Sequence, residues 1–168
     1  MIQNQYIDDL KQLSVVARQC IAVTCFERYC RFHGLVHQAI DQFIEHEWRI
    51  VSIHKPSDFN VWEQAFQEMP ITGQGDPYPD SLDVAIPLTL RKEFDNLILH
   101  VFETSATTWY GHDLEGTVKH LVEVLKIIDS YGIALPNLEM FRQPLAHIHD
   151  GWGAPLSEAE AKRWKEAA

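Results

Sequence analysis

Apolar residues recur every three or four positions along most of this chain, and that spacing is typical of helices that bury one face. The clearest segment spans residues 113 to 131. Asp113 can accept hydrogen bonds from the amides of the first turn, while Gly132 and then Pro136 end the helix. The buried face consists of Leu114, Val118, Leu121, Leu125 and Ile128. This pattern predicts an amphipathic helix.

The same spacing predicts helices elsewhere in the chain. Residues 5 to 33 would make an unusually long helix, so we expect a break or kink near Ser14 and an end at Gly34, which tolerates the left-handed conformation. Further helical segments follow at residues 36–51 and 59–69.

The same spacing also predicts helices in the second half of the chain. One helix should begin at Thr89 and end in the Thr104–Thr108 cluster. The last one should begin at Ser157, because Ser157 and Glu160 have the spacing of a capping box.

Residues 71–87, ITGQGDPYPDSLDVAIP, interrupt this order. Two glycines, three prolines and three aspartates give neither the helical nor the strand period, although Leu82–Leu88 could form a short strand. We therefore predict one long loop here. Structureless loops of this length are uncommon inside compact domains and often functional, so the loop is a candidate site element as well as a plain surface excursion.

Together these segments predict a mainly α protein. The 168 residues are near the usual size of one domain, and folding at this length buries roughly 70% of the surface of the unfolded chain. We expect a single helical domain over residues 1–168, an irregular bundle of about five to seven helices with the long loop at 71–87.

Charge narrows the classes of partner. The net charge of −10 disfavours binding to nucleic acid and to anionic membrane surfaces, because both depend on Lys and Arg that neutralise phosphates. An acidic surface favours solubility and fast association with a basic protein. The chain begins with no signal-peptide pattern, and its most apolar run, residues 13–26, is too short and too polar to span a bilayer.

Three cysteines indicate a reducing compartment. Cys20, Cys25 and Cys30 are five residues apart, so on a helix successive thiols are rotated by roughly 140° and point in different directions. They cannot share a metal, and an odd number argues against a disulfide framework. We interpret them as small buried residues of a cytoplasmic protein.

The strongest candidate for metal chemistry is the segment His147-Ile148-His149-Asp150. Two histidines one residue apart can chelate one ion if the backbone is extended, and His112, at a neighbouring helix start, could add a ligand. The alternative is a polar loop without metal. The chain has no Glu-x-x-His, which argues against a di-iron bundle.

Glu47 is a candidate buried carboxylate. It falls on the apolar face of its helix, and a buried carboxylate must be paired, hydrogen-bonded or protonated. His120, on the flank of its own apolar face, is a possible partner. In the helix after Thr89, one polar row is expected to face solvent; it consists of Glu93, Asn96, His100 and Glu103.

The chain contains no nucleophile elbow, phosphate-binding loop or dinucleotide fingerprint, so no such motif assigns it to a class of enzyme. Its sequence is compatible with several classes of function. The leading hypothesis is a non-enzymatic protein-binding domain for a basic partner, without a cofactor, with the general size and charge of bacterial immunity proteins and antitoxins. Its contact residues would be Asp76, Tyr78, Asp80, Asp83, Trp109 and Trp152.

Two alternatives remain open. One is a hydrolase that uses a divalent transition metal, held by His112, His147, His149 and Asp150, to activate water. The other is a subunit of a homo-oligomer or larger assembly, whose helical faces pack on a sister chain.

Overall fold

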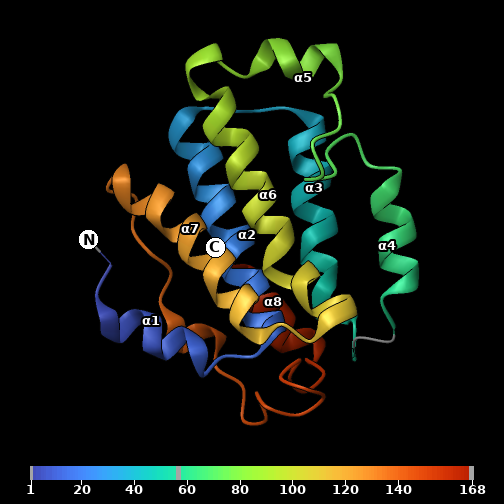
Figure 1. Ribbon diagram of the computed structural model, residues 1–168, viewed down its shortest axis with the longest axis vertical. Coiled ribbons are helices and arrows are strands. Elements are labelled where there is room, and N and C mark those ends of the chain that lie inside the picture. The colour runs from blue at the N-terminus through green and yellow to red at the C-terminus, as the bar shows by residue number, and fades with distance from the viewer. Residues whose placement is uncertain (1, 56–57, 167–168) are drawn as a thin grey trace.

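The structure is a computed structural model that describes residues 2–55 and 58–166, apart from the side chain of Tyr110. These residues form eight α helices joined by short 3₁₀ turns and loops (Figure 1). The mainly α prediction is confirmed, with one helix more than the expected range. The helices are α1 Asn4–Lys11, α2 Val15–His33, α3 Gln38–Trp48, α4 Asn60–Gln67, α5 Asp80–Ala85, α6 Leu88–Gly111, α7 Leu114–Ser130 and α8 Glu158–Glu166; the 3₁₀ turns are η1 Arg49–Ser52 and η3 Leu138–Phe141.

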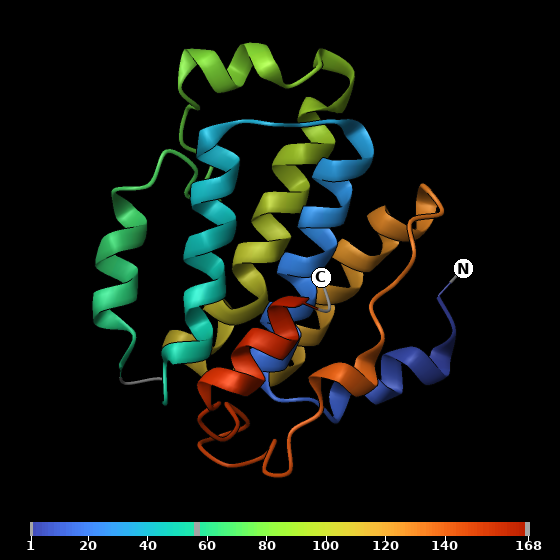
Figure 2. The same ribbon diagram turned by 180° about the vertical axis from the view of Figure 1, so that it is seen from behind.

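Helix α2 is the centre of the fold. It packs against α3, α6 and α7, and Figures 1 and 2 show α6 and α7 on one side of it and α8 over its lower part on the other. Every residue from Val15 to Phe26 is buried, so α2 has no solvent face along its first three turns. Helices α2 and α7 run toward the α5 end of the molecule, whereas α3 and α6 run away from it.

The predicted break at Ser14 is confirmed. Ser14 is the N-cap of α2, and its Oγ accepts a hydrogen bond from the Ala17 amide at 3.1 Å. Two further first-turn amides donate outside the helix, Val15 to the Gly151 carbonyl and Val16 to the Trp152 carbonyl. The segment after η3 therefore closes the start of the central helix. Gly34 ends α2 with a φ of 64°.

Arg18 holds three helices together although it interrupts the apolar run. Its side chain is buried and donates to the carbonyls of Leu10 and Lys11 at the end of α1, and to Leu114 and Thr117 at the start of α7. Four of the five N–H donors of Arg18 thus have a carbonyl or hydroxyl acceptor, which offsets the cost of burying the guanidinium group.

The prediction of one unbroken loop over residues 71–87 is wrong in its second half. Residues 80–85 form helix α5, which crosses the end of the bundle (Figure 1), and Leu82–Leu88 is not a strand. Leu82 and Ile86 are buried, so a short helix can pack here although six residues show no clear period. Residues 71–79 remain irregular, as predicted.

Helix α6 also differs from the prediction, because it continues through the Thr104–Thr108 cluster to Gly111. The hydroxyl of Thr104 donates to the His100 carbonyl and that of Thr108 to the Ser105 carbonyl, both at 2.7 Å. These bonds satisfy the hydroxyls inside the helix, so the cluster does not end it.

The cysteines and the apolar character of the helices also bear on the sequence predictions. Cys20, Cys25 and Cys30 are all free and buried, and burial raises the pKa of each thiol. Among the described residues, no helix has the length and apolar character needed to cross a membrane.

Candidate functional site

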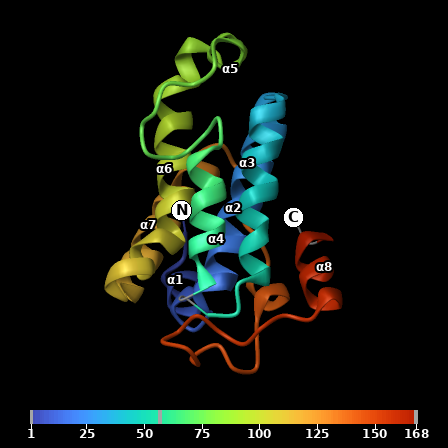
Figure 3. The same ribbon diagram turned by 90° about the vertical axis from the view of Figure 1, so that its right-hand side faces the viewer.

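Exposed apolar side chains gather at one end of the bundle. Val36 in the α2–α3 link, Val84 on α5 and Leu88 at the start of α6 are 84%, 86% and 81% exposed. Figures 1 and 3 place these three segments at the same end. Together with Asp80, which is also exposed, these side chains make up what we call the α5 surface. Exposed apolar groups that cluster, rather than lie singly, mark interaction sites.

Contacts on both sides of α5 fix this surface. The Ser81 hydroxyl lies 3.1 Å from Nε2 of His37, whose Nδ1 accepts a hydrogen bond from Ala39 at the start of α3. On the other side Arg91 forms an ion pair with Asp83 at 2.8 Å and also donates to the Asp83 carbonyl. Helix α5 is therefore attached to both α3 and α6.

A pocket of about 420 Å³ adjoins the α5 surface. Tyr78 donates to Asp95 at 2.7 Å, and burial together with that bond raises the pKa of the tyrosine. Asp76 accepts from the Thr72 hydroxyl. The lining comprises Thr72, Gly73, Gln74, Gly75, Asp76, Pro77, Tyr78, Asp83, Arg91, Asp95, Asn96, Ile98 and Leu99. Three carboxylates against one guanidinium leave this pocket acidic.

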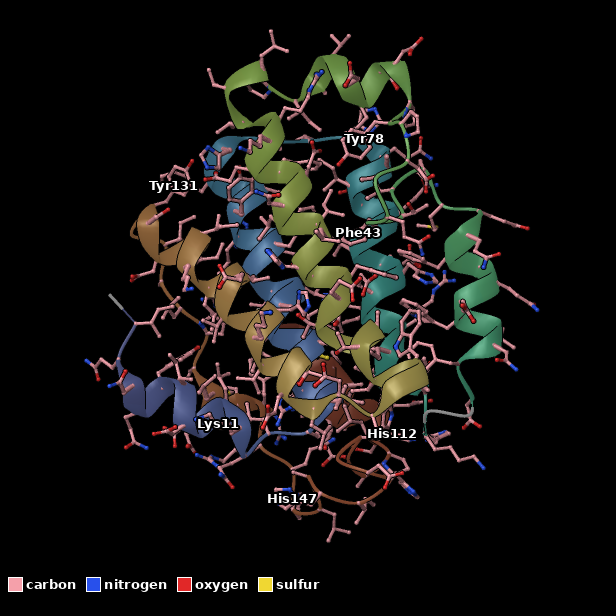
Figure 4. The ribbon with its side chains drawn as sticks, in the orientation of Figure 1. Lys11, Phe43, Tyr78, His112, Tyr131 and His147 are labelled. Atoms are coloured by element: carbon pink, nitrogen blue, oxygen red, sulfur yellow. The ribbon has the colours of Figure 1, made fainter. Side chains whose placement is uncertain are left out.

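The structure thus brings four of the six predicted contact residues to one end. Asp76, Tyr78 and Asp83 line the pocket, and Asp80 lies exposed in the first turn of α5. Figure 4 shows Tyr78 close to α5.

The two tryptophans of that prediction lie elsewhere. Trp152 is 1% exposed and donates to the Ile53 carbonyl, and Trp109 packs against Phe59 and Trp62 with ring centroids 4.1 and 4.9 Å apart. Both rings belong to the aromatic packing under α4, so neither contributes to the α5 surface.

The candidate metal residues lie at the opposite end of the molecule, where Figure 4 labels His112 and His147. His112, His147 and Asp150 line a pocket of about 430 Å³, but His149 does not. His112, His149 and Asp150 all have φ between 50° and 56°, so the local backbone is turned rather than extended. Across the described ranges, no three His, Cys, Asp or Glu side chains are placed to hold one ion.

Glu47 is buried, as its position on the helix predicted, and its partner is Gln19 rather than His120, which the sequence left as a possible partner. The Gln19 side-chain amide donates to Oε2 of Glu47 at 2.6 Å and to the Val101 carbonyl at 2.9 Å. Burial holds the pKa of Glu47 well above its usual range, although the bond from Gln19 lowers it. Glu47 therefore joins α3 to α2 and, through Gln19, to α6.

His120 instead faces His100, a contact that the sequence analysis missed. Their Nδ1 atoms are 3.0 Å apart across the interface of α6 and α7. His100 was expected in a solvent-facing row, and the structure corrects this, because His100, Glu93 and Glu103 are only partly exposed. Glu93 accepts hydrogen bonds from the hydroxyls of Tyr29 and Tyr131.

Comparison with known proteins finds no matching family model, no similar curated protein and no similar solved structure.

Proposed function

We propose that this protein is a non-enzymatic binding protein that docks a basic protein partner on its α5 surface. The observation that supports this most directly is the cluster of Val36, Val84 and Leu88, each more than 80% exposed. Keeping such side chains in contact with water is unfavourable in free energy, and a partner that covers them removes this unfavourable exposure.

Charge around the α5 surface favours a basic partner. Asp80 and Asp76 are exposed, and Asp41 is exposed in the first turn of α3, next to the α2–α3 link. Arg91, the cation nearest to α5, is already paired with Asp83. The remaining carboxylates give a negative rim around an apolar centre, which attracts Lys and Arg on a partner.

The same charges disfavour self-association through this surface. A symmetric dimer places the same patch against itself, so exposed carboxylates such as Asp80 of two copies would come close together. Like charges in contact destabilise such an interface, which makes a different, basic chain the better occupant. This role matches the general character of immunity proteins and antitoxins, and we propose that it is carried out in the cytoplasm, where thiols such as Cys20 stay reduced.

The test compares substitutions on the α5 surface with a control substitution on another part of the surface of the same protein. Immobilised wild-type chain is used to capture basic partners from the source cells at low salt, and the dissociation constant of each purified partner is then measured with Val84→Ser/Leu88→Ser and with Val61→Ser. Val61 on α4 is 78% exposed, so it is a matched control away from the α5 surface. We expect about a tenfold or greater loss of affinity in the double variant and none in the control.

Steering by charge is tested with the same partner. The association rate should fall as the salt concentration rises, because salt screens the attraction between the acidic rim and the partner. Equal affinities for wild type and the double variant would contradict the proposal, and so would a homodimer in light scattering that Val84→Ser/Leu88→Ser dissociates.

A further inference from the structure

Two histidines from different helices meet at the surface between α6 and α7. Nδ1 of His100 and Nδ1 of His120 form a hydrogen bond of 3.0 Å, in which one ring donates and the other accepts, and the ring centroids are 5.2 Å apart. Both side chains are partly exposed, so solutes reach the pair from water. Helices α6 and α7 pack closely along their length, which holds the two rings in place without any metal.

The spacing of the rings fits one tetrahedral ion. With a zinc–nitrogen bond of about 2.0–2.1 Å, tetrahedral zinc holds two imidazole nitrogens about 3.3 Å apart and their ring centroids about 5 Å apart. The observed separations are 3.0 and 5.2 Å. Zinc could thus bind both nitrogens after small ring rotations, and neither helix would have to move.

Zinc binding changes where the pair carries its protons. Both Nδ1 atoms must present a lone pair to zinc, so the proton in their hydrogen bond is released or moves to Nε2 when zinc binds. The carboxylates of Glu103 and Glu123, each three residues after one of the histidines, act electrostatically on His100, and Lys119 opposes them.

We propose that His100 and His120 form a binding site for one zinc ion, which links α6 to α7. Within the described part of the chain no third His, Cys, Asp or Glu is placed on the same ion, so water fills the other two positions. The site is distinct from the predicted histidine segment at 147–150, and it is independent of the α5 surface.

The experiment titrates zinc into the full-length, untagged chain after removal of bound metals with a chelator. Calorimetry gives the stoichiometry and affinity for wild type, His100→Gln, His120→Gln and the control His147→Gln/His149→Gln. We expect one equivalent to bind the wild type, affinity about tenfold or more weaker in each single variant, and no change in the control.

A spectroscopic readout separates ligand loss from misfolding. In histidine ring NMR spectra of the wild type, zinc should shift the Nδ1 signals of His100 and His120 and leave those of His147 and His149 unchanged. Zinc affinity in His100→Gln and His120→Gln equal to that of the wild type, or no binding by the wild type at millimolar zinc, would overturn the proposal.

Discussion

At the scale of single residues, the Glu47–Gln19 pair has an unusual feature. Oε1 of Glu47 and Oε1 of Gln19 are both buried without a hydrogen-bond partner, although the two head groups are already joined through Oε2 and Nε2. Two acceptors cannot satisfy each other. A proton on Oε1 of Glu47 turns one of them into a donor, and burial favours this protonated form because it raises the pKa of the carboxyl.

This state predicts a dependence of stability on pH. Above the ordinary pKa of 4.5 the unfolded chain loses the Glu47 proton and the folded chain keeps it, so the free energy of unfolding falls as pH rises toward the raised folded pKa. Glu47→Gln removes this slope and keeps the pairing with Gln19. We expect the variant to gain stability over the wild type between pH 5 and pH 8, by roughly 1–2 kcal/mol, in urea unfolding.

The measurement is the difference in unfolding free energy between Glu47→Gln and wild type at each pH. A difference that stays constant from pH 5 to pH 8 would show that Glu47 is ionised in the folded chain. Glu47→Ala should be destabilising at every pH, because it leaves a cavity and removes the acceptor of one N–H group of the Gln19 amide.

The burial of Glu47 could be predicted from its place on an apolar helix face, but its partner could not. Gln19 is 28 residues away on another helix, and helical period carries no information about which faces meet. The same limit explains why His100 and His120 were not paired: each was judged against its own helix alone.

At the scale of elements, helix ends were predicted best where a side chain caps the helix. Asp113 accepts from the Gly116 amide at 2.8 Å, and Ser157 and Glu160 exchange the hydrogen bonds of a capping box. These are local bonds, so local sequence specifies them. Helix α5 was missed because it lacks a side-chain cap and stays helical by packing Leu82 and Ile86 on the bundle.

Gly153 allows the loop between η3 and α8, residues 142–157, which we call the late loop, to contact α2. Adding a single methyl group at Gly153 should therefore have a large effect on stability. Its φ is 104°, and a Cβ there would lie 2.6 Å from Cβ of Ser14 and 2.3 Å from Oε1 of Gln143. Gly153→Ala should destabilise the fold by about 2–4 kcal/mol in thermal or urea unfolding, from backbone strain plus displacement of the α2 N-cap.

Gly75 supplies the control for that experiment. Its φ is 86°, but a Cβ there meets nothing within 4 Å. Gly75→Ala therefore reports backbone strain without the steric clash and should cost about 1 kcal/mol. If both variants lost the same stability, the close approach of the late loop to Ser14 would contribute nothing.

At the scale of the whole molecule, the two ends of the bundle differ in kind. The α5 end combines exposed apolar groups with carboxylates, whereas the opposite end is closed by the backbone of the late loop, whose carbonyls accept from the first amides of α2 (Figure 2). Net charge predicted a basic partner but not the position of the proposed α5 surface, because that position depends on how α5 lies relative to the α2–α3 link.

The burial of the first three turns of α2 on every side has a consequence for hydrogen exchange. Amides between Ile21 and Phe26 are both hydrogen-bonded in the helix and enclosed by α3, α6 and α7, so their protons should exchange with solvent only when the whole chain unfolds. Their exchange rate then measures global stability inside the native protein. Any molecule that binds only the folded chain should slow these few protons by the factor 1 + L/Kd, where L is its free concentration, wherever on the surface it binds.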